Sequence, residues 1–184
     1  DVYKRQCWGK GLGNGFPIGA LAGRRELMEL GGLRTDAERV FLVSTTHGPE
    51  TGGLAAYLAV DDEYAQHDVV ATMTDRGTRL ADAVRHEVAV AGLGEHLQLH
   101  GRPTSMVFAT LDGRPRPCQS MRTLFLQELL RHGVLGQSFV VSAAHTDDDL
   151  DLTVRAVRQS RNDHLWQDYL EYDERTDEAV ACLL

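Results

Sequence analysis

Residues 8–20 read WGKGLGNGFPIGA, and no other part of the chain says as much about its architecture. One lysine, Lys10, lies within a run of glycines that is followed by Pro17. Glycine permits positive φ and a close approach of the backbone to a flat ligand. A lysine amine in a tight, dry turn can lose its proton and attack a carbonyl. The stretch predicts a reactive lysine or, more plainly, a glycine-rich turn with a solvated lysine.

Two common phosphate-binding motifs do not fit this stretch. A dinucleotide fingerprint needs G-x-G-x-x-G, but its third glycine falls on Phe16 when counted from Gly11, and on Asn14 when counted from Gly9. A P-loop needs Ser or Thr after Gly-Lys, and Gly11 follows Lys10 here. A nucleotide-binding protein is therefore disfavoured.

Composition limits the class of protein. A chain of 184 residues with 42% hydrophobic residues is long enough for one packed domain, or for a domain with a small appendage. The net charge of −8 argues against non-specific nucleic-acid binding and against anionic membrane surfaces. Cys7, Cys118 and Cys182 lack metal-site or disulfide spacing. With no apolar run near the ~20 residues of a membrane span and no secretory signal, we expect a cytoplasmic protein without nucleic-acid, membrane or metal partners.

Short apolar runs and helical periodicity alternate along the chain. Strands are predicted over residues 18–23, 40–44, 98–100, 105–111 and 138–142. Helices are predicted over residues 24–30, from 49 onward, 69–88, 121–132 and from 147 onward. Thr146 is the expected cap of the last helix, with three aspartates following in its first turn, where the helix dipole favours carboxylates.

This pattern predicts two lobes. Residues 7–66 hold too few strands to close a sheet and read as the end of a larger α/β domain. Residues 67–160 read as a small α+β domain, and residues 161–184 as a divergent polar tail. Residues 1–6 (DVYKRQ) do not extend a strand toward the lysine, and we interpret them as a non-native leader. We therefore expect the C-terminal part of a longer protein.

Three blocks carry a family resemblance. The first is the lysine stretch, in which a small residue, Lys10, three free positions and two small residues follow one another. The others read FLVSTTHGPET at 41–51 and SFVVSAAHTDDDLD at 138–151. Together they resemble the glutamate-1-semialdehyde 2,1-aminomutase-like branch of class III aminotransferases, over residues 7–158. The resemblance implies an α/β fold of the aspartate-aminotransferase type (fold type I), with a large domain that binds pyridoxal 5'-phosphate (PLP) and a small α+β domain.

The resemblance also implies roles. Lys10 would form a Schiff base with PLP and move a proton between substrate and cofactor. Thr46 would bind the cofactor phosphate of the neighbouring subunit, which implies a homodimer of the full-length parent; from its residue type alone Thr46 is a helix cap. The substrates would be small amino and keto compounds. Neither the substrate nor the choice between aminomutase and aminotransferase follows from the residues.

The resemblance has limits. In this family other cofactor-binding residues precede the lysine, so we expect the chain alone to be inactive and the parent to be active. The alternative is a non-catalytic α/β binding or dimerisation module, in which Lys10 has no role.

Several other polar residues carry weaker signals. His47 is interpreted as a turn residue, and His145 as part of a helix start rather than as a metal ligand. His96 and His100 lie on a predicted strand and are not read as a ligand pair. Arginines at 114, 116 and 122 are candidates for contact with a substrate carboxylate, with solvated charges as the default interpretation.

Overall fold

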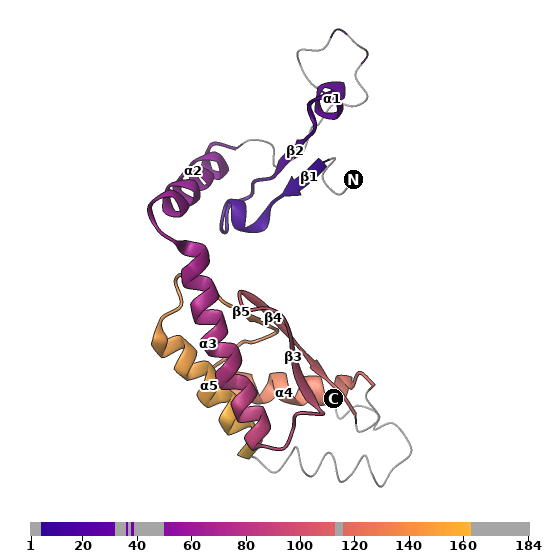
Figure 1. Ribbon diagram of the computed structural model, residues 1–184, viewed down its shortest axis with the longest axis vertical. Helices are drawn as coiled ribbons and strands as arrows, with labels where there is room; N and C mark the ends of the chain where they lie inside the picture. The colour runs from indigo at the N-terminus through magenta and orange to yellow at the C-terminus, as the bar shows by residue number, and fades with distance from the viewer. Residues whose placement is uncertain (1–4, 32–35, 37, 39–49, 113–115, 163–184) are drawn as a thin grey trace. The chain divides into compact units, whose positions relative to one another are not determined.

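The computed structural model of the protein describes residues 5–31, 36, 38, 50–112 and 116–162 (Figure 1). The chain divides into two compact units, Asp1–Asp68 and Val69–Leu184. Each unit is described by itself below.

The described residues of the first unit form a strand pair and four helical segments. Strand β1 (Arg5–Trp8) pairs antiparallel with β2 (Ala20–Gly23). The 3-10 helix η1 (Lys10–Leu12) lies in the connection between the two strands. Then follow α1 (Arg25–Met28), the 3-10 helix η2 (Glu29–Gly31) and α2 (Thr51–Gln66). The lysine stretch thus links two hydrogen-bonded strands.

The start of β1 corrects one expectation. We expected residues 1–6 to stay outside any strand, but Arg5 pairs with Gly23, and Gln6 with Ala22. Strand pairing is made by backbone groups, so polar residues can extend a strand whose partner offers free backbone groups. Native and non-native residues can form the same backbone hydrogen bonds. The pairing of Arg5 and Gln6 therefore does not test the interpretation of residues 1–6 as a non-native leader, which stays a prediction.

The first unit has almost no interior. Among its described residues the buried ones are Gly13 and Gly53. All four residues of β2 are exposed, although its sequence is ALAG. Helix α2 exposes large apolar or aromatic side chains at Leu54, Tyr57, Leu58 and Tyr64. A two-stranded sheet is marginally stable by itself, because it has no second layer to bury its faces.

The second unit has two layers. Its strands β3 (Leu97–Arg102), β4 (Ser105–Thr110) and β5 (Phe139–Val140) form an antiparallel sheet in that order. Its helices are α3 (Val69–Val90), α4 (Gln119–Arg131) and α5 (Asp147–Asn162). Figure 1 shows α3 and α5 side by side, in agreement with their contacts. These elements lie where the sequence predicts a strand or a helix, with ends that differ by a few residues.

The core of the second unit lies between the helices and one face of the sheet. Met106 and Phe108 of β4 point into it, whereas Val107 between them is 52% exposed. Phe125 of α4 is 1% exposed, and its ring meets Phe108 edge to face with centroids 5.0 Å apart. Burying one such ring stabilises the fold by about 1.5–3 kcal/mol. The alternation along β4 explains why the helices cover one face only.

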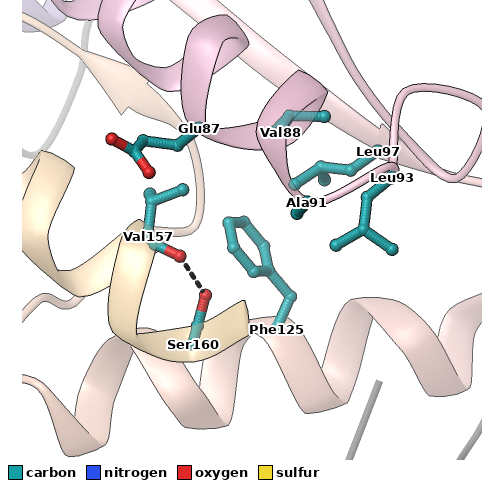
Figure 2. Close-up of a pocket in the computed structure, with 8 residues that line it drawn as sticks. All are labelled: Glu87, Val88, Ala91, Leu93, Leu97, Phe125, Val157 and Ser160. Carbon is teal, nitrogen blue, oxygen red and sulfur yellow. Dashed lines mark hydrogen bonds between the residues drawn. The ribbon is translucent and has the colours of Figure 1, made fainter. Parts of the chain in front are cut away.

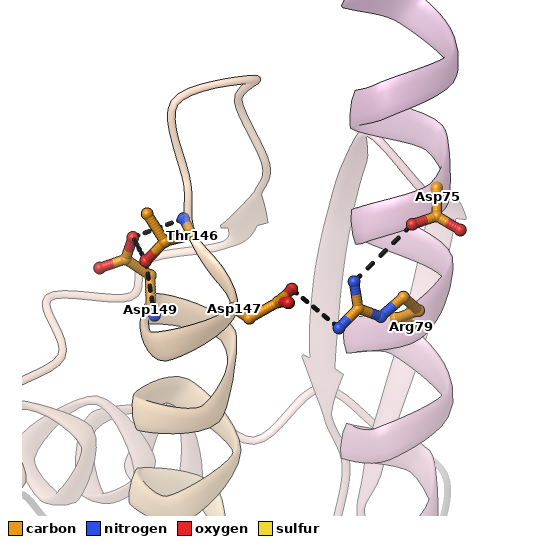
Figure 3. A network of polar contacts seen from close by, with 5 residues as sticks. All are labelled: Asp75, Arg79, Thr146, Asp147 and Asp149. Atoms are coloured by element: carbon orange, nitrogen blue, oxygen red, sulfur yellow. Dashed lines mark hydrogen bonds and ion pairs between the residues drawn. The ribbon is translucent and has the colours of Figure 1, made fainter.

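Helix α5 begins as its sequence predicts. Thr146 Oγ1 accepts a hydrogen bond from the backbone N–H of Asp149 at 3.3 Å, and Asp149 Oδ2 accepts one from the Thr146 N–H at 2.7 Å. Figure 3 shows this reciprocal cap and the ion pair of 2.8 Å between Asp147 and Arg79, which ties α5 to α3. The Thr146 N–H and hydroxyl both donate to Asp149 Oδ2 and lower the pKa of this carboxyl below its ordinary value, and the nearby His145 lowers it further.

Candidate functional site

Lys10 heads a tight turn. Its backbone lies in the left-handed region, with φ of 49°. Its carbonyl oxygen accepts hydrogen bonds from Gly13 N at 3.3 Å and Asn14 N at 3.2 Å. The carbonyl of Gly9 accepts one from Leu12 N at 3.1 Å. These bonds close the loop around the lysine and fix the direction in which its side chain leaves the backbone.

The surface beside Lys10 is bare. Lys10 is exposed, and both of its neighbours are glycines. A Cβ atom added at Gly11 would have no atom within 4 Å, and one added at Gly9 would meet only the Ile18 carbonyl oxygen, at 3.9 Å. The glycines on either side thus place no side chain beside Lys10. This arrangement is compatible with a lysine that carries a planar group and equally with a solvated lysine.

The loop returns toward β2 through Phe16–Ile18, and this segment lies against two buried glycines. A Cβ atom at Gly13 would lie 2.6 Å from both Ile18 Cγ2 and the Phe16 carbonyl oxygen. A Cβ atom at Gly53, in the first turn of α2, would lie 2.5 Å from the Pro17 carbonyl oxygen. Any larger residue at either position would displace the loop. Sequence analysis did not single out Gly53; its signal is a pair of glycines inside a helix.

The second predicted cofactor residue, Thr46, lies outside the described residues, as do His47 and Arg114. Helix α2 begins at Thr51 with Glu50 as its N-cap. Because Glu50 is the N-cap of α2, the alternative prediction that Thr46 caps this helix is wrong. The contact of Thr46 with the cofactor phosphate stays a prediction.

The remaining arginines that we considered have structural partners. Arg122 donates hydrogen bonds to the carbonyl oxygens of Phe108, at 3.1 Å, and Gln137, at 3.0 Å, and its guanidinium carbon lies 4.5 Å from the centre of the Phe108 ring. Arg116 pairs with Asp112 at 3.0 Å. Arg122 thus joins β4 to the loop before β5, which accounts for its position without a ligand.

The histidines are likewise held by local contacts. His145 Nδ1 accepts a hydrogen bond from the backbone N–H of Ser142 at 2.9 Å, and lies 2.9 Å from the Ser142 hydroxyl. His96 Nδ1 lies 3.1 Å from the carbonyl oxygen of Leu111, and His100 lies on β3. Within the described ranges no group of three or more His, Cys, Asp or Glu side chains could hold a metal ion.

Figure 2 shows a small cavity in the second unit, of about 10 Å³. This is room for about one water molecule and far too little for a cofactor. The Glu87 carboxylate at its edge accepts hydrogen bonds from Arg158 at 2.7 and 3.0 Å and raises the pKa of that guanidinium. The cavity is lined by Glu87, Val88, Ala91, Leu93, Leu97, Phe125, Val157 and Ser160. It is a packing defect of the core.

In sequence the chain is similar to proteins named as aminotransferases and aminomutases. It is 27% identical over 156 residues to a 3-aminobutyryl-CoA aminotransferase of Cloacimonas acidaminovorans, covering 83% of this chain and 36% of that protein. It is 26% identical over 164 residues to a glutamate-1-semialdehyde 2,1-aminomutase of Akkermansia muciniphila, covering 84% and 38%. No family model matches the chain.

Solved structures give the same result for the fold. The FumI protein of Sphingopyxis sp. MTA144, in its PLP internal aldimine form, superposes with a TM-score of 0.71 at 24% identity over 90% of this chain and 38% of that one. A transaminase with PLP bound gives 0.76 at 17% identity over 89% and 39%. An omega-transaminase from Sphaerobacter thermophilus gives 0.72 at 19% identity over 87% and 38%.

These comparisons confirm the predicted resemblance to class III aminotransferases and the predicted α/β fold of type I. The chain spans between a third and two fifths of the length of the proteins it matches. In the parts of the chain that the structure describes, no helix combines the length and apolar character needed to cross a membrane.

Proposed function

We propose that this chain is part of a PLP-dependent enzyme of the class III aminotransferase type, which moves amino groups between small amino and keto compounds or within one such compound. The observation that carries the proposal is the sequence likeness to an aminotransferase and an aminomutase over 83% and 84% of the chain. Because the chain matches less than two fifths of their length, the activity is proposed for a longer protein that contains it.

The two units take different parts in this proposal. Residues 7–66 would belong to the large PLP-binding domain, and residues 67–160 would form the small C-terminal domain. The lack of an interior in the first unit supports this, because apolar strands and helices with exposed faces need further layers to cover them. The complete core of the second unit supports its assignment as a domain of its own.

Lys10 is the residue that we propose to hold the cofactor. When bound, PLP supplies an aldehyde for covalent attachment and a ring that takes up electrons. The Lys10 amine would hold the cofactor by condensing with that aldehyde, with loss of water, and as a free amine it would carry a proton from the substrate α-carbon. The exposed side chain and the bare backbone at Gly9 and Gly11 leave room for these steps.

The partners follow from the same likeness. We propose a cytoplasmic homodimer, with Thr46 of one subunit contacting the cofactor phosphate held by the other. The net charge of −8 supports a protein without nucleic-acid partners. The choice between intramolecular and intermolecular amine transfer is left to experiment.

The proposal is tested by amino-transfer activity in the full-length protein. Amino donors and keto acceptors are supplied with PLP, and turnover is compared between wild type and Lys10→Ala. Loss of a proton-transferring group costs about 10²–10⁴-fold, so we expect at least a hundredfold fall in turnover. Unchanged turnover in Lys10→Ala would exclude Lys10 from the reaction. No turnover in either protein, and no PLP binding, would favour the non-catalytic module.

A further inference from the structure

The first turn of α2 rests directly on the lysine loop. The backbone of Gly53 approaches the Pro17 carbonyl so closely that an added Cβ atom would lie 2.5 Å from its oxygen and 3.4 Å from its carbon. Gly53 and Gly13 are the buried residues of the described first unit, and Gly13 meets the same return segment from the side of the loop. The segment Phe16–Ile18 is therefore packed between the backbone of Gly13 and the backbone of Gly53.

This contact explains an unfavourable choice of residue. Glycine inside a helix costs about 1 kcal/mol relative to alanine, and α2 carries two glycines in its first turn, Gly52 and Gly53. A Cβ atom at Gly52 would meet the Phe16 ring at 3.8 Å, an ordinary contact. The close approach thus requires glycine at position 53 and not at position 52.

We propose that Gly53 is a positioning residue for Lys10: by admitting the Pro17 carbonyl against α2, it fixes the lysine loop relative to the start of that helix. The inference rests on the proposed function. The loop that Gly53 supports is the one whose turn, with Lys10 at φ 49°, directs the amine.

The size of the effect follows from the sensitivity of catalytic geometry. A displacement of about 1 Å can cost about a hundredfold in rate. An added methyl at Gly53 must move the loop or the helix by a comparable amount, because 2.5 Å is well inside the contact distance of carbon and oxygen and the obstacle is backbone. Cofactor attachment at Lys10 should therefore weaken without any change of a group that touches the cofactor.

The test compares Gly53→Ala with Gly52→Ala in the full-length protein. Both substitutions add the same methyl and the same helix propensity, and only the first meets the Pro17 carbonyl. We expect Gly53→Ala to weaken PLP binding by about tenfold or more, and to shift the pH titration of the visible absorption of bound PLP. Gly52→Ala should match wild type in both. Equal binding and equal titration in the two variants would overturn the inference.

Two controls keep the result interpretable. If wild type itself carries no PLP on Lys10, the proposed function fails; if wild type does and Gly53→Ala behaves like it, only the positioning role fails. Should Gly53→Ala not fold, Gly13→Ala tests the same return segment, because a Cβ atom at Gly13 would lie 2.6 Å from the Phe16 carbonyl oxygen. This variant is expected to bind PLP more weakly than Gly52→Ala. Binding as tight as that of Gly52→Ala would overturn the inference.

Discussion

Lys10 and Asn14 are the non-glycine residues with positive φ in the described chain, at 49° and 44°. Both lie in the loop that carries the proposed cofactor lysine. For a residue with a side chain, this conformation costs about 1–2 kcal/mol. Such strain gathers at functional sites, where the surrounding structure holds it in place. The surrounding loop thus holds the Lys10 backbone in a conformation that lysine does not favour. We expect a lysine at such a position when its amine has a function.

A matched pair of substitutions tests this strain. Lys10→Gly and Lys10→Ala both remove the amine, but only glycine adopts positive φ without cost. We expect the glycine variant to be more stable than the alanine variant by about 1 kcal/mol. The free energy of unfolding is measured with urea in the full-length protein, where the first unit is proposed to be part of a larger domain. Equal stability of the two variants would show that the left-handed conformation is not kept.

Gly77 of α3 offers a second residue-level prediction. A Cβ atom there would lie 2.0 Å from the Pro103 carbonyl oxygen in the turn between β3 and β4. Alanine gains about 1 kcal/mol of helix propensity, but overpacking against backbone costs about 1–3 kcal/mol. We expect Gly77→Ala to lower the melting temperature, and Thr78→Ala on the exposed side of the same turn to leave it nearly unchanged. A Gly77→Ala protein more stable than wild type would contradict this prediction, because it would show that the β3–β4 turn moves to admit the methyl group at little cost.

The sequence revealed the site only in part, for a physical reason. Lys10 can be recognised from the sequence because a single charged residue within a run of glycines is an unusual local composition. Gly53 does not, because its importance lies in a contact with Pro17 that is more than thirty residues away in the chain. The roles of residues within a site depend on such distant contacts, which no local pattern contains.

At the scale of elements, periodicity predicted the helices better than the ends of strands. Helix α3 was expected over 69–88 and runs Val69–Val90, and its buried residues recur at helical spacing from Gly77 to Val88. Strand β5 was expected over 138–142 but is Phe139–Val140, because pairing with Met106 and Ser105 alone sets its length. The ends of a strand depend on the partner strand, and the local sequence carries no information about where that partner lies.

The start of α5 gives a prediction at this scale. Removing a threonine cap typically costs about 1 kcal/mol, so Thr146→Ala should destabilise the second unit by about this amount, measured by urea unfolding. Thr146→Ser keeps the hydroxyl and should restore most of the loss. If Thr146→Ser were as unstable as Thr146→Ala, the hydroxyl would not be the stabilising group.

The same cap makes stability depend on pH. The pKa of Asp149 is lowered in the folded state by its hydrogen bonds from Thr146, so the folded state favours the carboxylate. This contribution is complete above the ordinary aspartate pKa of about 4 and is lost as the pH falls through the lower folded value. Thr146→Ala should therefore show a shallower fall of stability below pH 4 and an Asp149 pKa closer to normal by NMR titration. An unchanged Asp149 pKa would contradict this.

At the scale of the molecule, the two units differ in what they bury. Among the described residues the buried hydrophobic cluster lies within residues 80–157, whereas the first unit exposes Trp8, Phe16 and large apolar side chains of α2. We expect residues 69–162 expressed alone to unfold cooperatively on heating, as followed by circular dichroism. Residues 1–68 alone should bind a hydrophobic dye and show no cooperative transition. Cooperative unfolding of the first unit by itself would contradict our assignment of it to a larger domain.

The central claim is that Lys10 holds PLP in the longer protein to which this chain belongs. The most direct measurement is reduction of the PLP-loaded full-length protein with borohydride, followed by proteolysis and mass spectrometry. We predict one stable pyridoxyl group, on the lysine of the peptide that contains WGKGLGNGFPIGA. A pyridoxyl group on another lysine, or on none, would contradict the account.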